Sequence, residues 1–167
     1  MTTVGLSAVA VQSGLFGLTS SLMADTPAAD AKPRVRVAFL RPKIDRYWMG
    51  WPGACYDIKA READYVKTMT DAAEKLGVQL EVDAETIVDI AAVDKLLAEC
   101  RQRPPDGIIL TVGGLAPDYW PHANKFVAEK GELPAIVFSP RGTSFTGHLQ
   151  AARKATKCFT AATQDHG

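Results

Sequence analysis

Short apolar runs alternate along this sequence with segments of helical periodicity, and that alternation constrains the fold more than any other feature. The runs predict strands at 35–40, 79–87, 107–112, 135–139 and 158–163. Between them, apolar residues recur every three or four positions, which predicts helices over 57–76, 90–103, 118–130 and 148–155. Strands that alternate with helices are typical of βαβ units and a parallel sheet. We therefore predict an α/β fold: a doubly wound, flavodoxin-like parallel sheet of about five strands in the order 2-1-3-4-5, with helices on both faces.

Local signals indicate where several of these elements end. Gly77 follows the first helix in the position of a C-terminal glycine, and Asp89 stands where an N-cap residue would begin the second. Pro104 stops that second helix. The run 79–87 alternates between apolar and polar residues, so we expect this strand nearer an edge, whereas 107–112 is apolar throughout and indicates a strand covered on both faces.

The amino-terminal region differs in composition from the rest. Residues 1–24 contain no Asp, Glu, Lys, Arg or His, and end on a small residue, Ala24. We expect a signal peptide over 1–24, a spacer over 25–33 and one domain over 34–167. This predicts an exported, periplasmic protein, using the Sec or the Tat route, with only transient membrane contact through the signal segment. The alternative is an uncleaved membrane anchor over residues 3–24.

Charge and cysteine content restrict the classes of partner. The chain has 19 basic and 19 acidic residues, so no basic excess points to nucleic acid. Its three cysteines form no C-x-x-C and are odd in number, so neither a zinc site nor a disulfide framework is expected. Cys100 falls on the apolar stripe of the second predicted helix and is expected in the core.

The segment after the first strand has an unusual composition for a connection. It contains cations, a carboxylate and tryptophans: Arg41, Asp45, Arg46, Trp48 and Trp51. In an open parallel sheet, ligands bind beyond the carboxyl ends of the strands. Arginine and carboxylate groups bind hydroxyls, and tryptophan covers the C–H face of a sugar, so this set favours a monosaccharide ligand. Alternatively, Trp48 and Trp51 fill a domain or subunit interface.

Several sharper motifs are absent. No G-x-G-x-x-G follows the first strand, and no G-x-x-x-x-G-K-[ST] occurs, so a dinucleotide or a P-loop nucleotide site is not expected. None of the three histidines has a partner at the third or fourth following position. We therefore expect no metal site within this chain.

Four segments together carry a family resemblance. VRVAFLRPKIDRYWMGWPGACYDIKAREADY, DGIILTVGG, PAIVFSPRGTSFTGHLQA and AATQD resemble the amino-terminal domain of L-fucose/L-arabinose isomerase-like proteins, of the exported bacterial type. The resemblance extends over roughly residues 33–165. It implies a flavodoxin-like domain that contacts sugar and packs in a homo-oligomer. By position, Ser144 and His148 in the loop after the fourth strand would join Arg41, Arg46, Trp48 and Trp51 in that role.

The resemblance also implies where the chemistry lies. That family interconverts aldoses and ketoses with a divalent metal, usually Mn²⁺, held by Glu, Asp and His residues of later domains. This sequence ends before those domains, so we expect a sugar-contacting fragment that holds no cofactor and is inactive alone. Two other classes remain open: a non-catalytic sugar-binding module resembling one lobe of a periplasmic binding protein, and a structural subunit whose tryptophans serve assembly.

The first prediction concerns turnover. The purified chain, assayed with Mn²⁺ and a panel of aldoses, is expected to form no ketose, because the residues that hold the family's metal have no counterpart in this sequence. Chromatographic separation of aldose from ketose after long incubation provides the measurement. Ketose formation above the rate in a protein-free control would contradict the prediction.

Overall fold

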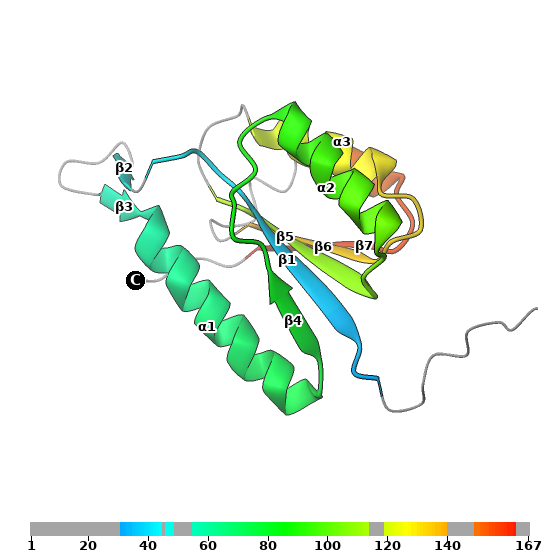
Figure 1. Ribbon diagram of the computed structural model, residues 1–167. Coiled ribbons are helices and arrows are strands. Elements are labelled where there is room, and N and C mark those ends of the chain that lie inside the picture. Colours follow the sequence, from blue (N-terminus) through cyan, green and yellow to red (C-terminus); the bar gives the residue numbers. More distant parts are fainter. Residues whose placement is uncertain (1–30, 45, 49–54, 114–118, 140–148, 163–167) are drawn as a thin grey trace, which may run out of the picture. The chain divides into compact units, whose positions relative to one another are not determined.

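The computed structural model of the chain describes residues 31–44, 46–48, 55–113, 119–139 and 149–162 (Figure 1). The chain divides into two compact units, Met1–Ala31 and Lys32–Gly167. The second unit contains the sheet and the helices that cover it. Of the predicted site residues, Asp45, Trp51, Ser144 and His148 lie outside the described residues.

Five parallel strands form the central sheet of this unit. They are β1 (Arg34–Leu40), β4 (Gln79–Val82), β5 (Gly107–Val112), β6 (Ala135–Ser139) and β7 (Cys158–Ala162). Their order across the sheet is β4-β1-β5-β6-β7, which confirms the predicted order 2-1-3-4-5. β4 lies at one edge, as its alternating pattern predicts. It is shorter than expected, because the strand predicted over 79–87 ends at Val82, and beyond it Ile87 makes only an isolated bridge with Leu40.

Helices cover the sheet on both sides. They are α1 (Ile58–Leu76), α2 (Ile90–Gln102), α3 (Trp120–Glu129) and the 3₁₀ helix η3 (Gln150–Arg153). α1 lies on one face of the sheet, and α2 and α3 lie on the other (Figure 1). The helix predicted over 148–155 is therefore only a short 3₁₀ helix in the described residues. Among the helices described, none has the length and apolar character needed to cross a bilayer.

The helix ends follow from local hydrogen bonding. The carboxylates of Asp57 and Asp89 each accept the N–H of the third following residue, at 2.8 Å, and so cap α1 and α2. Gly77 ends α1 with φ at 68°, a left-handed conformation that a side chain would strain. Both Gly77 and Asp89 confirm the boundaries read from the sequence.

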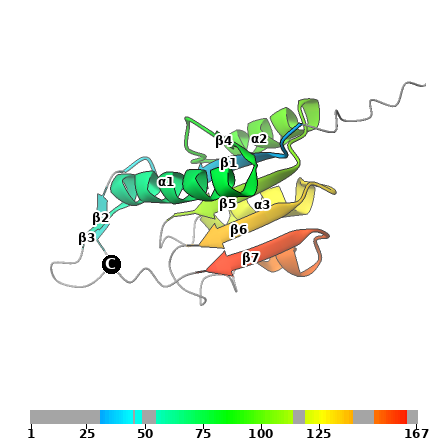
Figure 2. The same cartoon turned by 90° about the horizontal axis from the view of Figure 1, so that it is seen from below.

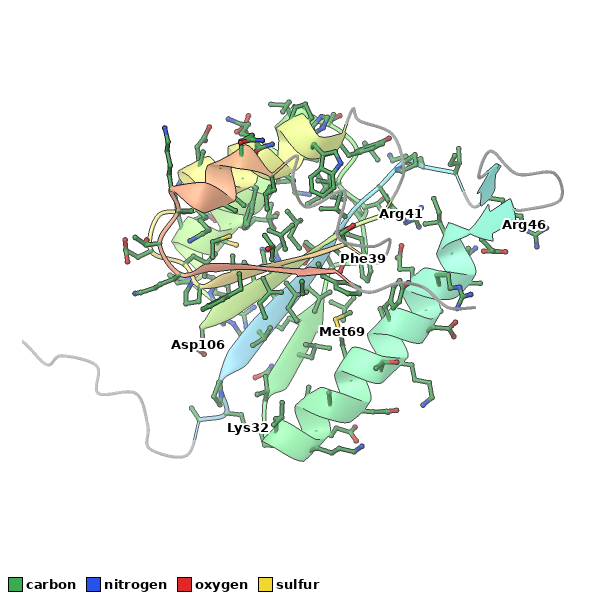
Figure 3. The ribbon with its side chains drawn as sticks, turned by 180° about the vertical axis from the view of Figure 1, so that it is seen from behind. Lys32, Phe39, Arg41, Arg46, Met69 and Asp106 are labelled. Atoms are coloured by element: carbon green, nitrogen blue, oxygen red, sulfur yellow. The ribbon has the colours of Figure 1, made fainter. Side chains whose placement is uncertain are left out.

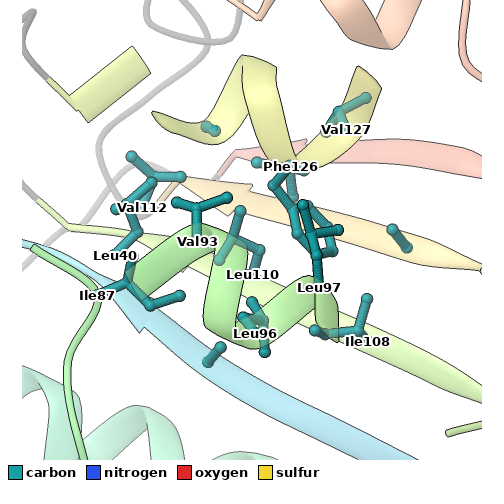
Figure 4. Close-up of a cluster of buried hydrophobic side chains, with 14 of the residues drawn as sticks. Leu40, Ile87, Val93, Leu96, Leu97, Ile108, Leu110, Val112, Phe126 and Val127 are labelled. Carbon is teal, nitrogen blue, oxygen red and sulfur yellow. The ribbon is translucent and has the colours of Figure 1, made fainter. Parts of the chain in front are cut away.

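The main core lies between the sheet and α2 and α3. Leu40, Ile108, Leu110 and Val112 from the sheet pack against α2 and α3 (Figure 4). The facing residues of the helices are buried: Val93, Leu96, Leu97, Cys100, Trp120, Ala123, Phe126 and Val127. Cys100 is 6% exposed, which confirms its predicted core position. Burial of this apolar area is the main stabilising term of the fold.

The other face of the sheet, which we call the α1 face, is built from two rows of residues in register. The first row crosses all five strands: Val82, Val37, Ile109, Ile136 and Phe159. The second row crosses four: Phe39, Thr111, Phe138 and Ala161. Because parallel partners point to the same side of a sheet, all nine side chains lie on the α1 face.

One element differs from the sequence prediction. The segment after β1 was expected to be a loop, but β2 (Arg46–Trp48) pairs with β3 (Cys55–Asp57) in an antiparallel hairpin. Aromatic residues favour strand pairing, and Tyr47 lies opposite Tyr56 in the register. The sequence predicted a loop because the glycines and prolines of this segment are typical of turns. β3 runs directly into α1, so the hairpin lies beside the amino end of that helix (Figure 1).

A buried lysine ties the amino-terminal edge of the sheet together. Lys130, which follows α3, is only 7% exposed. Its Nζ donates to three backbone carbonyls, of Gly131 at 3.1 Å, Leu133 at 2.8 Å and Thr156 at 2.6 Å. These contacts join the turn before β6 to the turn before β7 and satisfy every proton of the ammonium group.

The second prediction tests this tie. Lys130→Met keeps the aliphatic stem but leaves three part-buried carbonyls without their donor, so we expect the free energy of unfolding to fall by roughly 1–3 kcal/mol. Urea unfolding followed by circular dichroism measures it. Lys154→Met replaces an exposed lysine near the same edge and serves as the matched control. Equal stability of the two variants would contradict the prediction.

Candidate functional site

The point at which the connections of the sheet reverse direction lies between the carboxyl ends of β1 and β5, and in open parallel sheets a ligand-binding crevice forms at this point. β1 continues into α1, on one face of the sheet, whereas β5 leads to α3, on the opposite face (Figure 1). Where neighbouring parallel strands connect to helices on opposite faces, the chain diverges and leaves room for a ligand. β4 and β1 also lead to helices on opposite faces, but the connection from β4 crosses over β1 to reach β5. β1 and β5 are the adjacent strands whose connections run away from each other, to β4 and to β6. The residues that follow these two strands are therefore the candidates to examine.

Arg41, the residue after β1, lies at this end of the sheet (Figure 3). Its backbone N–H donates to the carbonyl of Ile87 at 3.1 Å, and its Cβ would lie 3.6 Å from a Cβ placed on Gly113 after β5. The backbone of Gly113 donates to Leu40 at 2.9 Å. Arg41 and Gly113 therefore continue the two strands side by side.

The Arg41 guanidinium is held by an acidic partner on α1. Its Nε donates to a carboxylate oxygen of Glu62, and its Nη1 donates to the carbonyl of Pro42 at 3.0 Å. The side chains of Arg41 and Glu62 are 11% and 24% exposed. Within the described part of the chain, Nη2 of Arg41 has no hydrogen-bond partner. The pair thus presents an oriented donor beside a carboxylate acceptor.

A buried hydroxyl lies one row below, on the same face. Thr111, in β5, is 2% exposed, and its Oγ1 has no hydrogen-bond partner among the described residues. It stands between Phe39 and Phe138 in the second row of the α1 face. A buried hydroxyl without a partner lowers the free energy of unfolding. Such a group is either a packing defect or the binding partner of a ligand or a water molecule.

The described residues bring together only part of the predicted site. Arg46 lies on the hairpin, away from Arg41 (Figure 3); its side chain is 72% exposed and pairs with Asp57 at 2.9 Å. The Ala60 N–H and then Arg46 lower the pKa of Asp57, so the hairpin and the cap of α1 share one carboxylate. Trp48 belongs to β2 by its backbone, and its side chain is not described.

Two residues of this crevice were missed by the sequence analysis. Glu62 is not among the candidates chosen from the sequence, but on α1 it faces the sheet and pairs with Arg41. Helical position gave a usable signal: Glu62, Val66, Met69 and Ala73 share one side of α1. Thr111 was read only as part of an apolar strand, and nothing in the sequence marks its hydroxyl as unpaired.

A second groove lies beside β4. It has a volume of about 190 Å³ and is lined by residues that include Arg36, Asp83, Lys95 and Glu99. Arg36 binds Asp83 through two hydrogen bonds, of 2.7 and 3.0 Å, and Glu99 through a third, of 2.5 Å. Burial opposes the charge of Arg36, but the bonds to both carboxylates outweigh it and raise its pKa above the ordinary value. Because these charges pair with one another, we assign this cluster a structural role: it joins β1, the turn after β4, and α2.

Metal ligands do not converge in the described residues. No group of three or more His, Cys, Asp or Glu side chains there is arranged to hold a metal ion. The histidine of α3, His122, instead lies against Tyr119, with 5.8 Å between the ring centres. Binding of Mn²⁺ is therefore implied by the family resemblance alone, and it is expected in domains other than this one.

Comparisons with known proteins gave no neighbour. No family model, no curated protein and no solved structure matches this chain. The fold is thus established by the sheet order itself.

The third prediction concerns the unpaired hydroxyl. Thr111→Val keeps the shape and removes the buried polar group, so we expect the free energy of unfolding to rise by about 1 kcal/mol in the absence of ligand. Thr68→Val is the control, because the Thr68 hydroxyl is exposed and donates to the Asp64 carbonyl at 2.9 Å. Urea unfolding measures both. A loss of stability in Thr111→Val would mean that the hydroxyl has a partner.

Proposed function

We propose that this domain binds a neutral monosaccharide at the crevice between the carboxyl ends of β1 and β5. The observation that carries the proposal is the Arg41 guanidinium, which Glu62 holds in place and which keeps one nitrogen unpaired within the described residues. Sugar hydroxyls both donate and accept, and here an oriented donor lies beside an acceptor. A preoriented arginine loses little side-chain entropy when it binds a ligand.

The charge of the pair favours a neutral ligand over a phosphorylated one. Glu62 balances the charge of Arg41, so no excess positive charge is left to attract a phosphate group. A phosphate site instead relies on uncompensated cations or on the backbone of a helix amino terminus. The aromatic sequence of the neighbouring hairpin supports a sugar as well, since indole rings cover the C–H face of a pyranose.

We further propose that the domain is the sugar-contacting part of an exported, metal-dependent aldose–ketose isomerase-like protein. The support is the family resemblance over residues 33–165 together with the flavodoxin-like sheet order. On this proposal the isomerisation, its Mn²⁺ and the metal ligands belong to other domains, and the protein functions as a homo-oligomer in the periplasm. The role of this domain is to hold one end of the sugar.

The fourth prediction tests the binding site. Titration of the full chain with neutral aldoses and ketoses, followed by calorimetry and tryptophan fluorescence, is expected to show binding of at least one sugar. Arg41→Gln removes the charged donor, so we expect its affinity for that sugar to fall by about tenfold or more. Glu62→Gln should weaken binding as well, because it releases the guanidinium from its orientation.

Arg103→Gln is the matched control for this titration. Arg103 follows α2 and lies at the amino ends of the strands, where it pairs with Glu81 at 3.0 Å. Its replacement should leave the affinity unchanged. Affinity for the corresponding sugar phosphates should be no higher than for the neutral sugars. Equal affinity of the Arg41→Gln variant and the unmodified chain would refute the assignment of this site.

A further inference from the structure

The α1 face is covered unevenly, and the exposure of its first row shows where the cover ends. Val37, in β1, is fully buried, but Ile136 in β6 is 40% exposed and Phe159 in β7 is 69% exposed. Figure 2 shows α1 in front of β1 and β4, with no described helix in front of β6 and β7. The strip formed by β6 and β7 on this face is apolar and faces outward.

A groove of about 230 Å³ runs between this strip and α1. It is lined by Tyr65, Thr68, Met69, Ile109, Ile136 and Phe138, none of which carries a charge. Met69 points from α1 toward the sheet (Figure 3), and the rings of Tyr65 and Phe138 meet edge to face with 5.6 Å between their centres. On the side of α1 that carries Tyr65 and Met69, Leu76 is 77% exposed, so apolar side chains continue along the helix.

The shape of the strip fits one helix. Parallel sheets are normally covered on both faces, and in this unit α2, α3 and η3 cover the opposite face. The strip from β5 to β7 spans two strand spacings, about 10 Å, which is close to the diameter of an α-helix. A helix placed there would lie beside α1 and would cover Ile136 and Phe159.

The exposed area argues against a second copy of this chain as the occupant. The outward parts of Ile136, Phe159 and their apolar neighbours amount to roughly 300–400 Å². A stable dimer buries about 800 Å² on each partner. An amphipathic helix, by contrast, binds through three or four apolar anchors in a groove of this kind.

We propose that the groove between α1 and β6–β7 is a docking site for an amphipathic helix of a different protein. The partner helix presents leucine, isoleucine or methionine at positions i, i+3 or i+4, and i+7, and keeps its polar side toward solvent. This interaction is separate from the proposed sugar site, which lies at the carboxyl ends of β1 and β5.

The test uses an 18-residue, fluorescein-labelled peptide with leucines at helical spacing and lysine and glutamate elsewhere. Fluorescence anisotropy is expected to show saturable binding to the full chain, and no comparable binding of a scrambled peptide of the same composition. Phe159→Glu and Ile136→Glu place a charge in the groove and should each weaken binding by about tenfold or more. Circular dichroism confirms that both variants are folded.

Val82→Glu is the matched control. Val82 lies in the same row, at the opposite edge of the sheet, and is 39% exposed, so its replacement tests for unspecific adhesion to apolar surface. It should bind the peptide as the unmodified chain does. Failure of the helical peptide to bind more tightly than the scrambled one overturns the proposal. Concentration-dependent dimerisation in analytical ultracentrifugation that Phe159→Glu abolishes also overturns it, because the occupant would then be a second copy.

Discussion

The need of a parallel sheet to bury both of its faces governs this structure. On one face, α2 and α3 enclose a continuous core with Leu40, Leu110 and Val112. On the other, α1 is the one helix in the described part of the chain that covers the sheet, and along the first row the exposed fraction rises from zero at Val37 to 69% at Phe159. The fold is therefore held mainly from one side, and its other side has an apolar strip that fits one more helix.

The same topology creates the candidate site. Because β1 connects through α1 to β4 and β5 connects through α3 to β6, the two connections run away from each other at the carboxyl ends of β1 and β5. Arg41 and Gly113 occupy this point, and α1 brings Glu62 to it. Sheet order thus selects the position of the site, and the side chains at that position determine which ligands it suits.

Two arginines of the first strand region illustrate how similar residues acquire different roles. Arg36 donates hydrogen bonds to two carboxylates, those of Asp83 in the turn after β4 and of Glu99 in α2. Its guanidinium therefore has a structural role, since it links these elements to β1. Arg41 has one carboxylate partner, and within the described residues one nitrogen of its fork is left for a ligand. Net charge explains neither role, since the difference lies in how many acceptors the fold brings to each guanidinium.

The sequence by itself determined the five strands of the central sheet, the three α-helices and their order along the chain. Apolar periodicity gave the five parallel strands, and Asp89 and Gly77 marked helix boundaries that the structure confirms. These signals work because a cap or a helical repeat involves residues no more than a few positions apart. The same locality allowed Arg41 to be chosen as a candidate, since its place after the first strand is a matter of sequence.

Tertiary structure alone decided the contacts between distant residues. The pairing of Arg41 with Glu62, the unpaired Thr111 hydroxyl and the exposure of Phe159 each depend on how helices lie over the sheet. The β2–β3 hairpin was likewise missed, because two segments of three residues become strands only when they meet each other. Burial and pairing are properties of the packed chain, so a side chain's neighbours along the sequence do not fix them.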